Sequence, residues 1–209
     1  MNQYSLFSKM AWYFNIRKKK QEIVEALEEL GILNKSMSVL DIGGGTGKIL
    51  SWIAPRVKRA VVLDPSPGMI AECTKRGIEC VLGRAEQIPF PNASFDLVMM
   101  HDVFHHIGDK EQAIRETYRA LAPQGSVVVA EFNPKTLRGW GVVVFEKILR
   151  LGSQFFTPKE FTELWQKYNF SGTTLKTYSG SYIMQFRKNP ISNSRARPSE
   201  ALAEEGISE

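Results

Sequence analysis

Short apolar runs recur along the first two thirds of the chain, and patterns with helical spacing separate them. The runs predict buried strands, because they are short and apolar toward both faces; they are residues 38–42, 60–64, 79–82, 95–100 and 126–131. Between them, apolar positions recur at helical spacing in residues 48–54, 68–76 and 110–121. This alternation predicts a parallel sheet that helices cover on both faces.

The two ends of the chain predict a helix and a tail. Apolar residues recur at helical spacing over residues 17–30, and Gly31 ends the pattern as a C-cap. From residue 188 onward the chain is polar and has no apolar periodicity, which is typical of disorder. We therefore expect one domain over residues 1–187, with a helical cap at 1–30, and a disordered tail at 188–209.

The pattern changes after the fifth predicted strand. Residues 132–155 form an insertion, in which a helix is predicted over residues 139–151. A further helix is predicted over residues 158–168, with Thr157 as its N-cap and Pro158 at its first position. Two final strands are expected at residues 173–178 and 182–187.

A glycine-rich loop, residues 41–47, directly follows the first predicted strand. Glycines allow the backbone to turn tightly and to approach a ligand without a Cβ in the way. The loop is not a phosphate-binding P-loop, since Ile42 and Ile49 occupy required positions. Nor is it the dinucleotide fingerprint, because its last glycine is replaced by Lys48 or Leu50. It carries an Asp-x-Gly-x-Gly-x-Gly pattern with an extra glycine inside it, made of Asp41, Gly43, Gly44, Gly45 and Gly47.

An acidic residue, Asp64, ends the second predicted strand. It follows Gly43 by 21 residues, a spacing at which a carboxylate can accept both hydroxyls of a ribose. The alternative is a helix N-cap within residues 64–67. Beside the glycine loop, ribose binding is the favoured interpretation.

Several motifs, in this order along the chain, resemble the class I S-adenosylmethionine-dependent methyltransferases, in particular the small type that includes ubiquinone/menaquinone C-methyltransferases. They are residues 7–13, 39–47, 63–69, 83–96, 119–125 and 156–161. The resemblance covers roughly residues 7–187. It implies a Rossmann-like, doubly wound α/β fold of seven mostly parallel strands, with the last strand antiparallel. It also implies S-adenosylmethionine as cofactor and S-adenosylhomocysteine as product.

The resemblance assigns cofactor contacts to Tyr13, Asp41, Gly43, Gly44, Gly45, Gly47, Asp64, Pro65, Met69, Arg84, Ala85, Glu86 and His101. In it, Asp64 binds the ribose, the region of Met69 packs near the adenine, and Tyr13 helps to close the pocket. One position departs from the pattern, because many relatives have Asp where this chain has Arg84. A guanidinium cannot accept the adenine amino protons, so we expect backbone groups around Ala85 and neighbouring side chains to bind the adenine.

All three histidines lie in residues 101–106, directly after the fourth predicted strand. His101 and His105 are candidates for a general base or for a group that orients the acceptor, since imidazole titrates near neutral pH. The alternative is that they serve packing and the shape of the cofactor pocket. A metal site built from these histidines and Asp102 is possible by ligand type. Because adjacent side chains rarely point together, we expect no metal.

Composition narrows the class of protein further. The chain has 209 residues, and Lys and Arg exceed Asp and Glu by 27 to 22, a net charge of +5. Residues 17–20 alone supply four of these charges, so no nucleic-acid partner is expected. Cys73 and Cys80 are expected to be unpaired thiols, which favours the cytoplasm. No apolar run approaches the ~18 residues of a membrane span.

The loop after the fourth strand also bears on the methyl acceptor. It lacks the Asn/Asp-Pro-Pro-aromatic run and the Pro-Cys pair typical of methyltransferases that act on nucleobases, so a small molecule is favoured. The insertion is rich in apolar residues, which predicts a hydrophobic or aromatic acceptor, unless these residues simply pack onto the sheet. The residues expected to form the acceptor cap, from the N-terminal segment and the insertion, are Tyr4, Phe7, Tyr13, Phe132, Asn133, Trp140, Val142, Val143, Val144 and Phe145. Tyr182 is a further candidate.

The predicted function is therefore methyl transfer from S-adenosylmethionine to a small molecule by in-line displacement. Two alternatives stay open. One is a regulatory protein that binds the cofactor without turnover, and the other is a methyltransferase of a macromolecule such as RNA or protein. The sequence leaves the oligomeric state undetermined.

Overall fold

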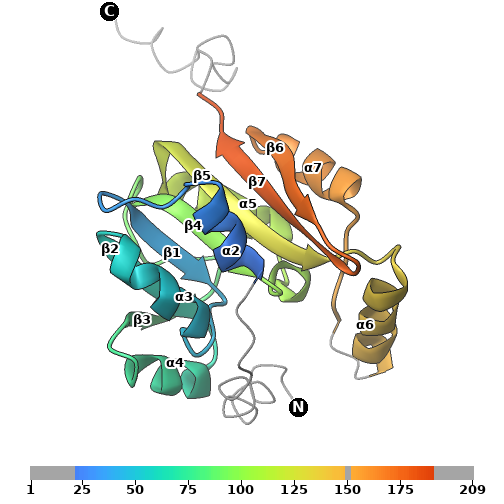
Figure 1. The fold of residues 1–209 in the computed structure, drawn as a ribbon, viewed down its shortest axis with the longest axis horizontal. Helices are drawn as coiled ribbons and strands as arrows, with labels where there is room; N and C mark the ends of the chain where they lie inside the picture. Colours follow the sequence, from blue (N-terminus) through green and yellow to red (C-terminus); the bar gives the residue numbers. More distant parts are fainter. Residues whose placement is uncertain (1–21, 149–151, 191–209) are drawn as a thin grey trace, which may run out of the picture.

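The computed structural model describes residues 22–148 and 152–190, which form a single seven-stranded sheet flanked by helices (Figure 1). The strands are β1 (Ser38–Ile42), β2 (Arg59–Asp64), β3 (Glu79–Leu82), β4 (Phe95–His101), β5 (Leu121–Phe132), β6 (Phe170–Thr177) and β7 (Ser181–Lys188). They are ordered β3-β2-β1-β4-β5-β7-β6. The pairs from β3 to β5 are parallel, whereas β7 is antiparallel to both of its neighbours. The predicted fold class is confirmed.

Helices cover both faces of this sheet, as the alternating pattern predicts. The helices are α2 (Glu22–Glu29), α3 (Lys48–Ile53), α4 (Pro67–Thr74), α5 (Lys110–Ala120), α6 (Leu137–Ile148) and α7 (Pro158–Gln166), with short 3-10 turns η1 (Ala54–Arg56) and η2 (Phe104–His106). Apolar side chains of α2, α3 and α4 pack on one face, and those of α5 and α7 pack on the other. Helix α6 lies apart from the sheet, beyond the end of β5 (Figure 1).

The strands alternate between the two apolar clusters, because successive side chains of a strand point to opposite faces. In β4, Leu97 and Met99 join the cluster under α2 and α3, whereas Val98 and Met100 join the cluster under α5 and α7. All four side chains are fully buried. A central parallel strand therefore has to be apolar at every position, which is why these runs could be recognised in the sequence.

Local signals fix the ends of several helices. Thr157 and Glu160 form a reciprocal capping box at the start of α7, so the predicted N-cap is confirmed. Gly31 has φ +61° just after α2, as expected for a C-cap. At α4 the N-cap is Ser66, whose hydroxyl accepts from the backbone N–H of Met69. Asp64 is therefore not a helix cap.

The two cysteines correct one prediction. Cys73 of α4 and Cys80 of β3 are joined by a disulfide, with their Cα atoms 6.2 Å apart. The expectation of unpaired thiols is wrong, because the tight turn between α4 and β3 returns the chain beside the helix it has just left. Because both cysteines are paired, free thiols no longer support a cytoplasmic location for the protein. Among the described residues, no helix combines the length and the apolar character needed to span a bilayer.

The order of the strands defines where a ligand can bind. From β1 the chain proceeds first to β2 and β3 on one side and then to β4 and β5 on the other. Ligands of open α/β sheets bind at such a reversal, outside the carboxyl ends of the strands. The carboxyl ends of β1, β2 and β4 lie there, and these strand ends with the loops that follow them carry the glycine motif, Asp64 and the histidines.

Candidate cofactor and acceptor site

The glycine loop takes backbone conformations that side chains disfavour. Gly43, Gly45 and Gly47 have φ of +67°, +57° and +70°. A Cβ on Gly43 would lie 2.2 Å from Cγ2 of Val103, in the loop after β4. A Cβ on Gly44 would lie 2.6 Å from Oδ2 of Asp41. The loop therefore packs closely against both neighbouring elements and leaves its backbone accessible to a ligand.

Asp64 is held directly beneath this loop. Its Oδ2 accepts from the backbone N–H of Gly45 at 3.0 Å, and its Oδ1 accepts from that of Ser66 at 2.9 Å. Burial raises the pKa of Asp64 to about 6, although these two backbone hydrogen bonds oppose the rise. A carboxylate fixed in this way keeps lone pairs for further donors, such as the hydroxyls of a ribose.

Asp41, at the end of β1, is the least satisfied acid of the described residues. Its side chain is 1% exposed, and neither carboxylate oxygen has a hydrogen-bond partner. Burial raises its pKa to about 8, and the nearby charge of Asp64 adds to the rise. A buried acceptor without a donor is costly, so this carboxylate is suited to a ligand that brings a cation or an N–H group.

A pocket lies beside the glycine loop, and the segments after β1, β2 and β3 contribute predicted site residues to its lining. Gly43, Pro65, Arg84, Ala85 and Glu86 line it. The sequence named all five of them. Val103, His106 and Ile107 close its other side, from the loop after β4.

The segment after β3 explains how the pocket accommodates Arg84. The guanidinium pairs with Oε1 of Glu86 at 3.0 Å, and the Arg84 side chain is half exposed. Ala85, between them, is 7% exposed and points into the core. The charged ends of the two flanking residues thus neutralise each other at the rim of the pocket.

Of two further predicted cofactor contacts, Met69 lies within the described residues and Tyr13 does not. Met69 is 6% exposed, and its Sδ lies 3.6 Å from where a Cβ on Gly45 would stand. Met69 therefore packs against the glycine loop from the first turn of α4. Tyr13 lies outside the described residues, as do Tyr4 and Phe7.

The two candidate histidines, His101 and His105, differ in burial and in the side chains that they contact. The His101 side chain, at the end of β4, is 17% exposed, and its Nδ1 lies 3.6 Å from Oδ2 of Asp102. His105 is 2% exposed and stacks on Phe155 with ring centroids 4.6 Å apart. His105 is thus closed off from an incoming acceptor, whereas His101 is not.

His105 is held between two carboxylates. Its Nδ1 lies 2.6 Å from Oε2 of Glu131, and its Nε2 lies 3.4 Å from Oε1 of Glu146. Burial alone would lower the pKa of His105, but the charge and hydrogen bond of Glu131, assisted by Glu146, raise it to about 10. The imidazole is therefore protonated at neutral pH in the structure without bound ions.

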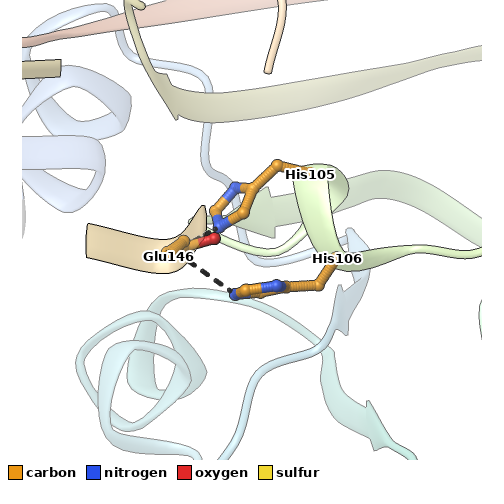
Figure 2. Close-up of side chains that lie close together, drawn as sticks. All are labelled: His105, His106 and Glu146. Carbon is orange, nitrogen blue, oxygen red and sulfur yellow. Dashed lines mark ion pairs between the residues drawn. The ribbon is translucent and has the colours of Figure 1, made fainter. Parts of the chain in front are cut away.

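His106 contacts the same carboxylate from the other side. Its Nε2 lies 3.8 Å from Oε1 of Glu146, and Figure 2 shows both rings directed at that side chain. Its Nδ1 lies 3.0 Å from the hydroxyl of Ser153. Burial, followed by the charge of His105, lowers the pKa of His106 to about 4, so this ring is neutral.

The two carboxylates of this cluster were not singled out from the sequence. Glu131 is the second-last residue of β5 and Glu146 lies in α6, both far along the chain from the histidines. One signal was available, since Glu131 is an acidic residue at the end of an otherwise apolar strand, the same position that Asp41 and Asp64 occupy. Tyr182 is fully buried and donates to the backbone carbonyl of Phe156, which removes it as an acceptor contact.

Comparison with known proteins agrees with this geometry. Residues 40–129 match the family described as the methyltransferase domain. A demethylmenaquinone methyltransferase from Thermus thermophilus is 33% identical over 132 residues, covering 58% of this chain and 60% of that protein. A ubiquinone/menaquinone biosynthesis C-methyltransferase from Hahella chejuensis is 34% identical over 131 residues, covering 56% and 53%. The chain spans little more than half the length of these curated relatives.

Solved structures share the fold. One is a SAM-dependent methyltransferase from Thermotoga maritima, described as a possible histamine N-methyltransferase. It superposes with a TM-score of 0.67 at 22% identity, over 90% of this chain and 93% of that chain.

Fold, loop and family match together define a class I methyltransferase domain. The chain is similar to S-adenosylmethionine-dependent methyltransferases of the group that includes the ubiquinone and menaquinone C-methyltransferases. The residues present fit the cofactor of that family. Asp41 would offer buried acceptors to its ammonium group, and Asp64 would offer acceptors to its ribose.

Proposed function

We propose that this protein transfers the methyl group of S-adenosylmethionine to a small lipophilic acceptor. The observation that carries the proposal is the pair of carboxylates at the strand reversal. Asp41 has no hydrogen-bond partner among the described residues, and Asp64 is aligned by the backbone N–H groups of Gly45 and Ser66. A cofactor with one cationic end and a ribose in its middle matches this pair.

In the proposed complex the cofactor supplies an electrophilic methyl group on a sulfonium. Asp64 accepts from the ribose hydroxyls, and Asp41 faces the ammonium of the methionine part. The backbone around Ala85, with Arg84 and Glu86 at the rim, contacts the adenine, and Pro65 and Met69 support its packing. Tyr13 stays our proposal for closing the pocket. The chain's part in the reaction is to align the two reactants and exclude water.

We propose His101 as the residue that orients the acceptor or takes its proton. Its side chain is partly exposed at the end of β4, beside the pocket loops. His105 was the other candidate from the sequence. Because both of its ring nitrogens face carboxylates, we now propose that it acts through its neighbours and not on the acceptor.

The acceptor is proposed to be apolar, and an aromatic quinol is the chemical class we favour. Helix α6 supports this, because its large apolar side chains are 59% to 86% exposed at Leu137, Trp140, Phe145 and Ile148. Two relatives at 33% and 34% identity are named for methylation in quinone biosynthesis. A nucleic-acid acceptor is not part of the proposal.

Two further expectations stay within this proposal. We propose that residues 1–187 act as one domain, with 132–155 as a lid over the acceptor and residues 188–209 as a tail. We also propose a cytoplasmic location, without the support of free thiols. Cell fractionation tests the location, and limited proteolysis followed by mass spectrometry tests the domain boundaries.

Cofactor and acceptor are tested in sequence. In thermal-shift titrations, S-adenosylmethionine and S-adenosylhomocysteine should raise the melting temperature, and NAD should not. Radiolabelled methyl transfer is then measured to a short-chain demethylmenaquinol, with total RNA as the alternative acceptor. Stabilisation by NAD alone would contradict the cofactor, and labelling of RNA alone would contradict the acceptor class. Cofactor binding without transfer to any acceptor would favour a regulatory role.

A further inference from the structure

The strongest feature that methyl transfer leaves unexplained is the buried cluster of His105, His106 and Glu146 (Figure 2). We propose that these three side chains bind a divalent transition-metal ion, for which Zn²⁺ is the best match. The sequence predicted no metal, because adjacent histidines rarely point together. Here they do, since η2 turns the chain tightly at Phe104–His106 and α6 presents Glu146 between the two rings.

The distances between the ligand atoms fit a metal. One ligand atom from each residue lies within 4.8 Å of the other two. Oε1 of Glu146 is 3.4 Å from Nε2 of His105 and 3.8 Å from Nε2 of His106. With ligand bonds of ~2.0–2.1 Å, neighbouring ligands of a tetrahedral zinc ion are about 3.3 Å apart. Small side-chain adjustments therefore bring all three atoms into the first coordination sphere.

The outer contacts of the two rings are those of metal-binding histidines. A ligating imidazole usually engages its second nitrogen with a carboxylate, a carbonyl or another oxygen, which fixes the direction of the ring. Nδ1 of His105 lies 2.6 Å from Glu131, and Nδ1 of His106 lies 3.0 Å from the Ser153 hydroxyl. Both Nε2 atoms are thereby directed at one point beside Glu146.

One atom of the cluster lacks what a metal would supply. Oε2 of Glu146 is buried and has no hydrogen-bond partner among the described residues. A metal bound to Glu146 would give this oxygen the positive partner that it lacks.

Three protein ligands leave a fourth position for an exchangeable group. A hollow lined by Val143, Glu146, Ser153 and Phe155 adjoins the cluster, and His106 also lines the cofactor pocket. Zinc sites with three protein ligands hold water or a substrate oxygen at the open position. On the proposed function, this oxygen would belong to the acceptor, which the metal would orient toward the methyl group.

Metal binding is tested directly with Co²⁺ and Zn²⁺ on the full-length chain, after treatment with a chelator. Co²⁺ should bind once per chain and give the visible absorption bands of a four-coordinate ion, and Zn²⁺ should displace it. Calorimetry of Zn²⁺ binding should show a single site per chain. None of these readouts needs the cofactor or methyl transfer, so they stand apart from the proposed function.

Single variants then assign the ligands. Glu146→Gln and His106→Gln should each weaken Co²⁺ binding at least about 100-fold, with folding checked by circular dichroism. The matched control is Glu163→Gln, which makes the same change on an exposed face of α7 and should leave binding unaltered. The proposal is overturned if the wild-type chain binds no Co²⁺. It is also overturned if binding persists in both folded variants, because the ion would then occupy another site.

Discussion

The glycine loop and the histidine cluster lie at the same edge of the sheet, yet they treat buried charge in opposite ways. At the loop, the carboxylate of Asp41 is buried without a hydrogen-bond partner in the part of the chain that the structure describes. In the cluster, the imidazole of His105 is equally buried but contacts Glu131 and Glu146. The first site has no partner for its carboxylate, whereas the second pairs its imidazole with its own carboxylates and leaves Oε2 of Glu146 without a partner among the described residues.

The pKa values show the same contrast. Burial raises the pKa of Asp41 to about 8, which favours the neutral carboxyl. Burial should also favour neutral His105, but the adjacent carboxylates prevail and its pKa rises to about 10. An unpaired acid in the core thus tends to lose its charge, while a paired base keeps it. The predictions below test whether the two sites differ in this way.

The largest effect is expected from Glu131→Gln, which breaks the buried pair. Removing one partner of such a pair costs about 3–5 kcal/mol of unfolding free energy. Because the pKa of His105 is raised from 6.5 to about 10, this stabilisation is complete below pH 6.5 and disappears as the pH approaches 10. Urea unfolding at pH 6 and pH 10, with EDTA present, should show a large loss at pH 6 and a small one at pH 10.

A surface pair provides the control for this prediction. Glu79 pairs with Arg59, and both side chains are well exposed. Glu79→Gln should therefore cost at most about 1 kcal/mol. Equal losses in the two variants, or a loss at Glu131 that does not depend on pH, would contradict the description of the cluster as a self-paired site.

Gly43→Ala should nearly abolish cofactor binding. The new Cβ would lie 2.2 Å from Cγ2 of Val103 at a residue with φ +67°, so the loop must move. We expect the dissociation constant of S-adenosylhomocysteine to rise by about 100-fold, measured by calorimetry. Gly77→Ala is the matched control, because it also has a positive φ of +70° but no atom within 4 Å of its Cβ. Weak binding in both variants would point to a general loss of stability.

The same contrast explains what the sequence revealed. Asp41, the glycines and Asp64 lie in two short motifs, each at the end of a strand, so their positions follow from local pattern and strand order. The parallel strands of the sheet were found for the same reason, whereas the antiparallel last strand was implied by the resemblance to the methyltransferases. Apolar runs of a buried parallel strand are visible without knowledge of tertiary contacts.

The cluster could not be found in this way. Its residues come from η2, β5 and α6. The position of Glu131 at the end of an apolar strand was the only local signal, and nothing local to Glu146 indicates that it meets the histidines. The disulfide was missed for a similar reason, since only the return of the chain from α4 to β3 brings Cys73 and Cys80 together. Contacts between different elements depend on how these elements pack, and the periodicity of apolar residues along the chain does not report this packing.

Asp64→Asn should weaken cofactor binding moderately. Hydrogen bonds to a charged group contribute about 1.5–3 kcal/mol, so we expect the dissociation constant to rise about 30-fold. Asp96→Asn is the control, because Asp96 also accepts from a backbone N–H, that of Ser38, but lies at the opposite edge of the sheet. Calorimetry with S-adenosylhomocysteine should separate the two variants. Unchanged affinity in Asp64→Asn would remove the ribose assignment.

The smallest effect on cofactor binding, together with a change of stability of definite sign, is expected from Asp41→Asn. The pKa of Asp41 is raised from 3.8 to about 8, so its contribution to stability is present below pH 4 and is lost as the pH rises to 8. The neutral amide avoids this loss. Without cofactor, the variant should therefore melt a few degrees higher than the wild-type protein at pH 8.5, and the gain should vanish near pH 4. Binding of S-adenosylhomocysteine should weaken about 10-fold, because the ammonium loses its carboxylate. If the melting temperatures of the variant and the wild-type protein changed in parallel from pH 4 to pH 8.5, Asp41 would not be an unpaired buried acid in the free protein. The contrast with the histidine cluster would then be wrong.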